Sequence, residues 1–269
     1  MNSDKKPLVS VITITYNAES FLKNTMESVL NQSNKDFEYL IIDGNSKDGT
    51  TSIIQQYPNQ KYDSFEAAMH RGDESHGKVV WISEPDKGLY DAMNKGLHLA
   101  KGGFVWFINS GDKIYDNTTM QQIADTYVQN APCDVIYGQS IIINEDESIK
   151  GERHKIAPKV LTMNSMLNGL VVCHQSILVK KEIAPDYDLQ YRIAADYDWT
   201  CKVLAKSQKN CYIDQYISRF MVAGVSSQQR KKAWKERYRI MKTHFGLFPT
   251  LWAHLIIAFH YPFSRNRQS

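Results

Sequence analysis

The sequence predicts an α/β fold in which a mostly parallel sheet is flanked by helices. Two observations support this class. Short apolar, β-branched runs alternate with amphipathic helical patterns through the first half of the chain, and most of the runs end in a cluster of turn residues. This β-α-β order favours parallel strands joined by right-handed crossovers, with helices on both faces of the sheet. Ligands of such sheets bind beyond the carboxyl ends of the strands.

Each element of the first half rests on a local pattern. LVSVITIT at residues 8–15 has the composition of a buried strand, and AESFLKNTMESVLNQS at 18–33 has the period of an amphipathic helix. The same patterns predict strands at 37–44, 79–83 and 104–109, a helix after the turn at 45–49, and a helix near 90–100. Residues 58–78 are polar and aperiodic, so we expect an irregular excursion there.

The second half is less regular. Its patterns predict helices at 118–130 and 196–206, strands at 134–143, 176–179 and 212–221, and a long basic helix at 227–244. We therefore expect two parts: a catalytic α/β domain over residues 1–225, and a basic helix with an apolar tail over residues 226–269.

The composition is that of an ordinary globular protein. The 269 residues are 42% hydrophobic and 23% charged, which excludes a wholly disordered, collagenous or disulfide-stapled chain. The formal net charge is only +3, too small to indicate a nucleic-acid partner without a clustered basic face. The charge is unevenly placed, because the last 40 residues contain nine Lys or Arg and one acid. They carry +8, and the preceding 229 residues carry −5.

The cysteines predict a redox state, and the amino-terminal residues predict a location. Cys133, Cys173, Cys201 and Cys211 show no CxxC pair or metal-ligand spacing, so we expect four buried reduced thiols. The chain enters its first strand without an apolar leader, which favours a cytoplasmic location.

Four polar clusters follow the predicted strands of the first half and should meet at one edge of the sheet. They contain Thr15, Tyr16 and Asn17; Asp43 and Ser46; Asp86, Lys87, Gly88 and Asp91; and Asn109, Ser110, Gly111 and Asp112. Asp, Asn and Gly also populate ordinary turns, so any one cluster alone has a purely structural explanation. Four clusters at one edge favour a ligand crevice.

The chemistry of this crevice favours a diphosphate bound through a cation. The glycine-rich motifs GxGxxG and GxxxxGK[ST] are both absent, which argues against dinucleotide and P-loop sites. An acidic crevice can hold a diphosphate through a divalent cation that neutralises both sides. Asp112, shortly after the apolar run FVWFIN, is the best-placed metal ligand, and the structural alternative is an N-cap or Asx turn before the following helix.

These residues resemble the family 2 glycosyltransferases of the nucleotide-diphospho-sugar transferase (GT-A) fold. The resemblance rests on VSVITITYN, FEYLIIDGNSKDGT, SEPDKGLYDAMNKGLHLAKGGFVWFINSGD, CHQS and AADYDW, and it spans roughly residues 7–221. It is strongest to small bacterial transferases of exopolysaccharide, colanic-acid and O-antigen assembly. It implies an enzyme, a hexosyltransferase-type glycosyltransferase that uses an NDP-sugar.

The resemblance also implies roles for the crevice residues. The nucleoside pocket corresponds to Thr15, Tyr16 and Asn17, with Asp43 on the base and Ser46 nearby. Asp86, Lys87 and Gly88 correspond to the loop along the nucleotide, and Asp91 to a residue facing the sugar diphosphate. The family's DxD motif corresponds to Ser110-Gly111-Asp112, so only the last carboxylate remains as a ligand for Mg²⁺ or Mn²⁺. The side chain of Asn109 can add only a neutral oxygen.

A catalytic base is implied at Asp196, which opens a predicted helix. One carboxylate suffices for an inverting transfer, in which the base deprotonates an acceptor hydroxyl that attacks the anomeric carbon. A retaining double displacement needs a second, nucleophilic carboxylate. Asp198 is the rival, and a helix N-cap is the structural alternative for Asp196. His174 resembles a position near the acceptor or the diphosphate, and a structural histidine is the alternative.

The carboxyl-terminal residues indicate a membrane surface. The segment 245–263, FGLFPTLWAHLIIAFHYPF, is free of formal charge and only marginally long enough to cross a bilayer. A basic helix before an apolar aromatic segment suits peripheral attachment to an anionic membrane. The alternatives are packing on the catalytic domain and a homodimer contact. Membrane attachment agrees with a polyprenyl-linked saccharide acceptor at the inner face of the bacterial cytoplasmic membrane.

The sequence therefore predicts an inverting glycosyltransferase that extends a surface-polysaccharide intermediate. The processive motif QxxRW is not reproduced by QQRKKAW at 228–234, so we expect one sugar transferred per acceptor. Two alternatives stay open: a catalytically silent sugar-nucleotide or glycan-binding module, because the DxD motif is incomplete, and a sugar nucleotidyltransferase. The latter needs a glycine-rich, basic first loop, whereas this chain has Thr15-Tyr16-Asn17-Ala18.

Overall fold

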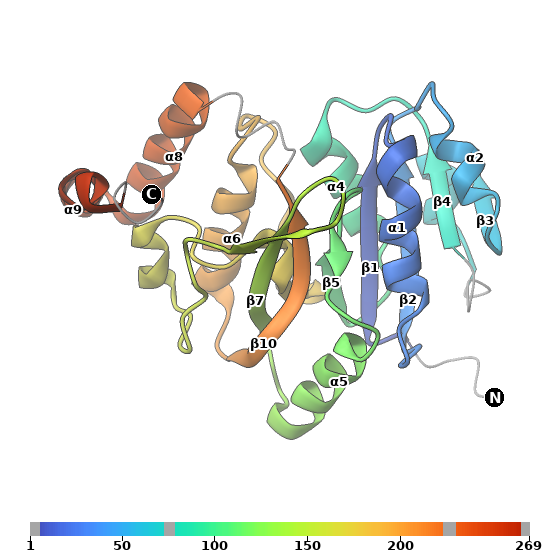
Figure 1. Ribbon diagram of the computed structural model, residues 1–269, viewed down its shortest axis with the longest axis horizontal. Coiled ribbons are helices and arrows are strands. Elements are labelled where there is room, and N and C mark those ends of the chain that lie inside the picture. Colours follow the sequence, from blue (N-terminus) through green and yellow to red (C-terminus); the bar gives the residue numbers. More distant parts are fainter. Residues whose placement is uncertain (1–5, 73–78, 223–229, 265–269) are drawn as a thin grey trace.

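The computed structural model describes residues 6–72, 79–222 and 230–264, with side chains of the last helix described up to residue 256. Ten strands within these residues form one sheet, in the order β3-β4-β2-β1-β5-β9-β7-β10-β6, with β8 paired to β7. Helices cover both faces of this sheet (Figure 1). The predicted α/β architecture with a mostly parallel sheet is confirmed.

The strands of the first half are parallel, as the β-α-β order predicts. They are β1 (Val9–Thr15), β2 (Phe37–Asp43), β3 (Asn59–Tyr62), β4 (Val79–Ser83) and β5 (Phe104–Phe107). Because β1 lies between β2 and β5, the direction of winding reverses at β1. Ligands of parallel α/β sheets bind at such a reversal, beyond the strand ends.

The helices of the first half pack on the two faces of this sheet. They are α1 (Glu19–Leu30), α2 (Thr50–Ile54), α3 (Phe65–Met69), α4 (Leu89–Leu99) and, after β6 (Lys113–Ile114), α5 (Thr119–Asn130). On one face of β1, Val9 and Val11 share a core cluster with Met26 of α1. On the other face, Ile12 packs in a second cluster with Leu97 of α4.

The expectation of an irregular excursion at residues 58–78 is wrong for its described part. Residues 58–72 contain the edge strand β3 and the short helix α3. The strand has the sequence NQKY and is partly exposed along its length, so it lacks the apolar pattern that marks an internal strand. Asn59 is held by Trp81 of β4, whose Nε1 donates to Asn59 Oδ1 at 3.1 Å. Residues 73–78 lie outside the described residues.

The second half completes the sheet with antiparallel as well as parallel pairs. Its elements are β7 (Val135–Ile143), β8 (Ile149–Glu152), the 3₁₀ segments η1 (Met163–Asn168), η2 (His174–Ser176) and η3 (Lys181–Ile183), β9 (Ile177–Lys180), α6 (Ala195–Lys206) and β10 (Asn210–Met221). Strand β9 is antiparallel to both neighbours, β5 and β7. Strand β10 pairs with β7 in parallel and with β6 in antiparallel.

Two helices, α8 (Arg230–Phe245) and α9 (Leu247–Ser264), follow the sheet and lie at the end of the molecule opposite β3 (Figure 1). Gly246 joins them with a φ of 81°, a left-handed conformation that glycine adopts without strain. Ile240 and Met241 of α8 and Ala253 of α9 are buried in the core cluster that contains α6. The expected start of the basic helix, residues 227–229, lies outside the described residues. A domain boundary at residue 225 stays a prediction.

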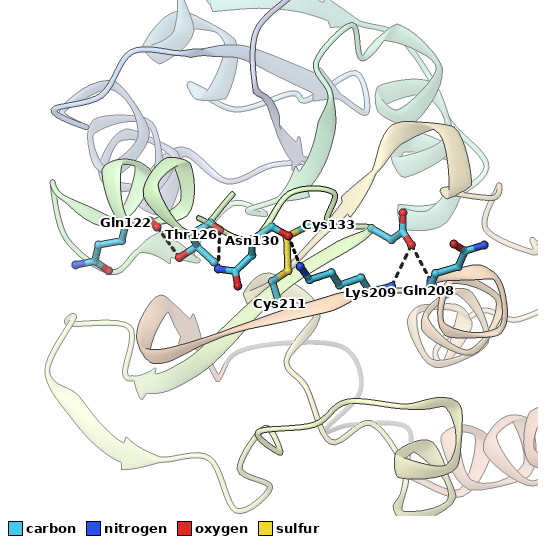
Figure 2. Close-up of a disulfide and its surroundings, with 8 residues drawn as sticks. Gln122, Thr126, Asn130, Cys133, Gln208, Lys209 and Cys211 are labelled. Carbon is cyan, nitrogen blue, oxygen red and sulfur yellow. Dashed lines mark hydrogen bonds between the residues drawn. A yellow bond between two sulfur atoms is a disulfide. The ribbon is translucent and has the colours of Figure 1, made fainter. Parts of the chain in front are cut away.

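The expectation of four reduced thiols is wrong. Cys133 and Cys211 form a disulfide (Figure 2), and Cys173 and Cys201 are free and buried. Cys133 lies just before β7 and Cys211 lies in β10, so the parallel pairing of these strands brings the two thiols together. The cysteines are 78 residues apart in the sequence, and no local spacing pattern reports a contact made by strand pairing.

Reduction of this disulfide should destabilise the protein. A cross-link between residues so far apart restricts the unfolded chain, and its loss typically lowers the free energy of unfolding by about 2–4 kcal/mol. We expect urea unfolding with dithiothreitol to shift to lower denaturant concentration. In Cys133→Ala, the matched control, dithiothreitol should have no effect. Identical unfolding curves for the wild-type protein with and without dithiothreitol would contradict the pairing.

Candidate active site

The carboxylate of Asp43, at the end of β2, organises the first part of the site. Asp43 is fully buried. Its Oδ1 accepts from Ser46 Oγ at 2.5 Å, and its Oδ2 accepts from Ser46 N at 3.0 Å and from Ser83 Oγ at 2.6 Å. The carboxylate thereby fixes the turn after β2 against the end of β4.

The loop after β1 is bonded to the same turn. Asn17 N donates to Ser46 Oγ at 2.8 Å, and Lys47 N donates to Asn17 Oδ1 at 2.8 Å. Asn17 has a φ of 47°, a left-handed conformation that asparagine tolerates better than most residues. The neighbouring Tyr16 is 62% exposed, so its ring is free to contact a ligand.

The loop after β4 forms a tight turn at the start of α4. Gly88 N donates to Asp86 Oδ1 at 2.8 Å, and Lys87 N donates to Asp91 Oδ2 at 2.9 Å. A Cβ on Gly44 would lie 2.6 Å from Asp86 Oδ2, so this loop directly contacts the turn after β2. The predicted nucleotide residues after β1, β2 and β4 therefore lie side by side.

The loop after β5 places Asp112 at the same edge of the sheet as the loops after β1, β2 and β4. Ser110 N donates to Ile14 O of β1 at 3.2 Å. Gly111 has a φ of 97°, and a Cβ there would lie 2.2 Å from Cε of Met221, so the position requires glycine. Asp112 is buried, and its carboxylate accepts from Gln175 Nε2 at 2.8 Å and from Met221 N at 3.0 Å.

Three buried side-chain oxygens at this edge have no hydrogen-bond partner among the described residues. They are Oγ1 of Thr15, Oδ1 of Asn109 and Oγ of Ser110. An unsatisfied buried polar atom costs about 1–3 kcal/mol, so such atoms usually have a bound partner in the working state of a protein. They lie at the ends of β1 and β5, where the winding of the sheet reverses and a ligand is expected.

The residues of the β5 loop fit a single divalent cation of the kind that the resemblance implies. Burial raises the pKa of Asp112 to about 7, against the lowering effect of its hydrogen bonds from Met221 and Gln175. No Lys, Arg or His in the described part of the chain pairs with this carboxylate, so a cation would supply the missing charge. Asn109 and Ser110 add neutral oxygens. The described residues contain no group of three or more His, Cys, Asp or Glu with metal-site geometry.

Asp196 lies in the first turn of α6 and is partly buried. Burial raises the pKa of its carboxyl, and the nearby guanidinium groups of Arg237 and Arg153 act in the opposite direction. Its Oδ1 accepts from Tyr197 N at 2.8 Å. Arg192, four residues earlier, donates from Nη1 to Lys87 O at 2.8 Å, so the start of α6 lies beside the nucleotide loop.

Glu236 of α8 holds the segment that leads into α6. Its buried carboxylate accepts three backbone N–H bonds, from Arg192 at 3.1 Å, Ile193 at 2.9 Å and Ala194 at 3.0 Å. A negative charge also interacts favourably with the amino-terminal end of a helix. Sequence analysis missed this role. The one available signal is that Glu236 is the single acid in the strongly basic last 40 residues.

The second carboxylate of α6, Asp198, has a structural role. It is 2% exposed, and it pairs with His244 Nε2 at 2.8 Å and with Lys202 Nζ at 2.7 Å. Although burial alone would raise the pKa of Asp198, the bonds from His244 and Lys202 lower it overall. Asp198 therefore ties α6 to the carboxyl-terminal end of α8.

His174 lies inside an aromatic cluster behind the β5 loop. It is 5% exposed, and its Nε2 lies 2.7 Å from Tyr187 Oη. The rings of Phe107 and Trp199 have centroids 5.4 and 5.6 Å from that of His174. Burial lowers the pKa of His174 to about 4, so the ring is neutral at physiological pH. Its neighbour Gln175, which holds Asp112, was missed as a site residue because the contact spans 63 residues.

The strand order, the loops beyond β1, β2, β4 and β5, and the carboxylate on α6 define a GT-A nucleotide-diphospho-sugar transferase fold. Residues 10–187 match the model of Glycosyl transferase family 2, and the chain belongs to this family. The predicted family, fold and enzyme class are confirmed: the protein is a glycosyltransferase.

Three known proteins illustrate the similarity. The putative teichuronic acid biosynthesis glycosyltransferase TuaG of Bacillus subtilis is 27% identical over 247 residues, covering 89% of this chain and 91% of TuaG. The structure of S. aureus TarS 1-349 in complex with UDP has a TM-score of 0.66 at 21% identity, covering 97% of this chain and 73% of the other. The mannosyltransferase PcManGT from Pyrobaculum calidifontis, in complex with GDP-Man and Mn²⁺, has a TM-score of 0.57 at 15% identity, covering 94% and 70%.

Removal of the charge on Glu236 should weaken both stability and activity. In Glu236→Gln the three backbone N–H groups lose their charged acceptor. A hydrogen bond to a charged group contributes about 1.5–3 kcal/mol to the free energy of unfolding. We expect the free energy of unfolding to fall by about 1–3 kcal/mol and glycosyl transfer to fall with it, measured by urea unfolding and by release of nucleoside diphosphate. Glu182→Gln, at a glutamate whose side chain is 75% exposed, is the matched control and should change neither. Unchanged stability in Glu236→Gln would contradict the role of this carboxylate.

Proposed function

We propose that the protein is an inverting, non-processive glycosyltransferase that moves one sugar from an NDP-sugar to a lipid-linked saccharide. The observation that supports this most directly is that the partly buried carboxylate of Asp196, which has no ion-pair partner among the described residues, lies beside the loops of the proposed donor crevice. Transfer to a hydroxyl needs a base on the side opposite the leaving diphosphate, and Asp196 has the required chemistry.

The donor is proposed to lie along the carboxyl ends of β1, β2, β4 and β5. Tyr16 and the turn held by Asp43 flank the nucleoside, and the Asp86–Gly88 loop runs beside it. Asp112, with Asn109 and Ser110, would hold Mg²⁺ or Mn²⁺. When bound, such an ion stabilises negative charge on the departing diphosphate.

The proposed reaction needs only one carboxylate from this chain. The Asp196 carboxylate accepts the proton of the acceptor hydroxyl, and the hydroxyl oxygen bonds to the anomeric carbon as the bond from that carbon to the diphosphate breaks. The configuration at the anomeric carbon inverts. A second displacement would need a free nucleophilic carboxylate, and Asp198 is occupied by His244 and Lys202.

The product is proposed to be an intermediate of a cell-surface polysaccharide. TuaG, which is similar to this chain over nine-tenths of both lengths, is named for teichuronic acid biosynthesis. The absence of the processive motif QxxRW from the sequence supports one transfer per acceptor. A silent sugar-nucleotide or glycan-binding module is the alternative, and formation of product distinguishes the two.

Replacement of Asp196 by asparagine should abolish transfer and leave nucleotide binding intact. An amide cannot accept the acceptor proton, and loss of general-base catalysis typically costs about 10²–10⁴-fold in rate. The readouts are release of nucleoside diphosphate with a lipid-linked acceptor and nucleotide affinity by calorimetry. Asp186→Asn, at an exposed aspartate, is the matched control.

The pH dependence gives an independent readout of the same base. A base works deprotonated, and burial raises the pKa of Asp196 above its usual 3.8. The rate should therefore rise with pH through a limb centred above that value. Full activity of Asp196→Asn, or a limb at or below pH 3.8, would show that another group is the base.

We also propose that α8 and α9 attach the enzyme to an anionic membrane surface. The large apolar side chains exposed on one side of α9, called here the α9 apolar stripe, are Leu247, Phe248, Leu251, Trp252, Leu255 and Ile256. Their spacing of i, i+1, i+4 and i+5 places them on one helical face, and the buried Thr250 and Ala253 lie on the opposite face. Such a helix suits burial in the headgroup region of a bilayer.

Basic residues of α8 border this surface. Lys235 and Arg239, with Trp234, Tyr238 and His254, line a cavity of about 370 Å³ between α8 and α9. Trp234 is 54% exposed, and its ring centroid lies 5.3 Å from that of His254. Exposed cations beside an apolar stripe complement anionic lipid headgroups. Within the described residues, no helix has the length and hydropathy required to cross a membrane.

Vesicle binding tests this surface. The protein should bind vesicles of phosphatidylglycerol more strongly than vesicles of phosphatidylcholine. Phe248→Ser and Trp252→Ser should each weaken binding about tenfold or more, because burial of such a side chain contributes about 1.5–3 kcal/mol. Val128→Ser, at a residue of α5 that is 78% exposed, is the matched control. Two results would refute the membrane role. One is equal binding to both lipids, and the other is a Trp252→Ser variant that loses concentration-dependent dimerisation but still binds vesicles.

A further inference from the structure

A cluster of three cations, called here the basic cluster, lies beside the start of α6. Its members are Arg153 and Lys155, which follow β8, and Arg237 of α8. Arg153 Nη2 donates to Leu170 O at 3.2 Å, and Lys155 Nζ donates to Asn168 O at 2.5 Å. A Cβ on Gly169 would lie 2.4 Å from Lys155 Nζ. Both side chains therefore lie on the loop that follows η1.

That loop places the two side chains next to Asp196. Tyr197, the residue after Asp196, donates from its hydroxyl to Met166 O of η1 at 2.6 Å. Arg237 belongs to α8, where the preceding residue, Glu236, is bonded to the segment just before α6, and its guanidinium acts electrostatically on both Asp196 and Lys155. The three cations thus come from two separate parts of the chain to the same end of α6.

Within the described residues, no carboxylate forms a close ion pair with the basic cluster. Among the residues that the structure describes, no carboxylate lies within 4 Å of the charged nitrogens of Arg153, Lys155 or Arg237. Burial, together with the positive charges of Arg237 and Arg153, lowers the pKa of Lys155 to about 8. The two guanidinium groups also act on Asp196, where they favour the charged carboxylate. Mutually repelling cations are stabilised when an anion binds between them.

We infer that Arg153, Lys155 and Arg237 bind the phosphate group through which the saccharide acceptor is attached to its lipid carrier. This inference rests on the proposed transfer to a lipid-linked acceptor. The basic cluster lies on the side of the proposed base, where the acceptor hydroxyl must enter. Arg237 also belongs to the helix that forms the membrane surface with α9, so a carrier embedded in that membrane would present its phosphate near this position.

Binding of farnesyl diphosphate to the full-length chain tests the inference. We expect calorimetry to detect binding that Arg153→Gln and Arg237→Gln each weaken about tenfold, because each removes a charge-assisted bond. Arg237 is exposed, so its replacement should leave the fold intact. Lys231→Gln removes the same charge from an exposed position of α8 and is the matched control. Farnesol, which has the same tail without phosphate, should bind weakly and equally to every variant.

A second titration separates the acceptor phosphate from the donor diphosphate. UDP, or another nucleoside diphosphate that binds, should retain its affinity in Arg237→Gln and should bind together with farnesyl diphosphate. If Arg237→Gln weakens the nucleotide as much as farnesyl diphosphate, the basic cluster belongs to the donor site and the inference is wrong. The inference is also wrong if both arginine variants bind farnesyl diphosphate as tightly as the wild-type protein does. It is equally wrong if the wild-type protein binds farnesyl diphosphate no more tightly than farnesol. Failure of every nucleotide to bind would instead refute the proposed function.

Discussion

The hydrogen bonds between the Glu236 carboxylate and the backbone before α6 hold helix α8 against the start of α6. Three N–H groups point at one buried carboxylate, and an N–H group left without an acceptor in that position would be costly. The second link, from Asp198 to His244, fixes the other end of α8 to the same helix. The basic helix is thereby part of the scaffold that positions Asp196. Contact of α8 and α9 with a membrane would then act directly on the side of the site that we propose for the acceptor.

The opposite wall of the site contains buried polar atoms that have no partner in the part of the chain that the structure describes. Asp43 is fully satisfied by Ser46 and Ser83, so it can act as a rigid support. In contrast, buried oxygens of Thr15, Asn109 and Ser110 have no hydrogen-bond partner among the described residues, and the buried carboxylate of Asp112 accepts a bond from the neutral Gln175. The oxygens without partners and the Asp112 carboxylate lie on adjacent loops, at the point where the winding of the sheet reverses. A ligand with hydrogen-bond donors, bound together with a divalent cation, would give these oxygens partners and would balance the charge of Asp112.

Local sequence patterns were enough to predict the first half of the fold and the meeting of its four polar loops at one edge of the sheet. The strands there are buried and β-branched, the helices are amphipathic, and polar residues follow each strand end. The polar edge strand Asn59–Tyr62 has no such pattern and was missed. Contacts between distant residues were also missed, namely the Cys133–Cys211 disulfide, the support of Asp112 by Gln175, and the support of α6 by Glu236. Each of these depends on how strands and helices are arranged in space, which no local period reports.

We propose that the crevice beyond β1, β2, β4 and β5 binds a nucleotide sugar, with Asp112 contributing to a cation site. A thermal-shift panel of UDP-, GDP- and dTDP-sugars, each with and without Mn²⁺, tests it most directly, because only a ligand that binds the folded state raises the unfolding temperature. We expect one class of nucleotide sugar to raise the unfolding temperature, and to raise it further with Mn²⁺ present. The absence of any response to every nucleotide sugar, with and without Mn²⁺, would contradict it.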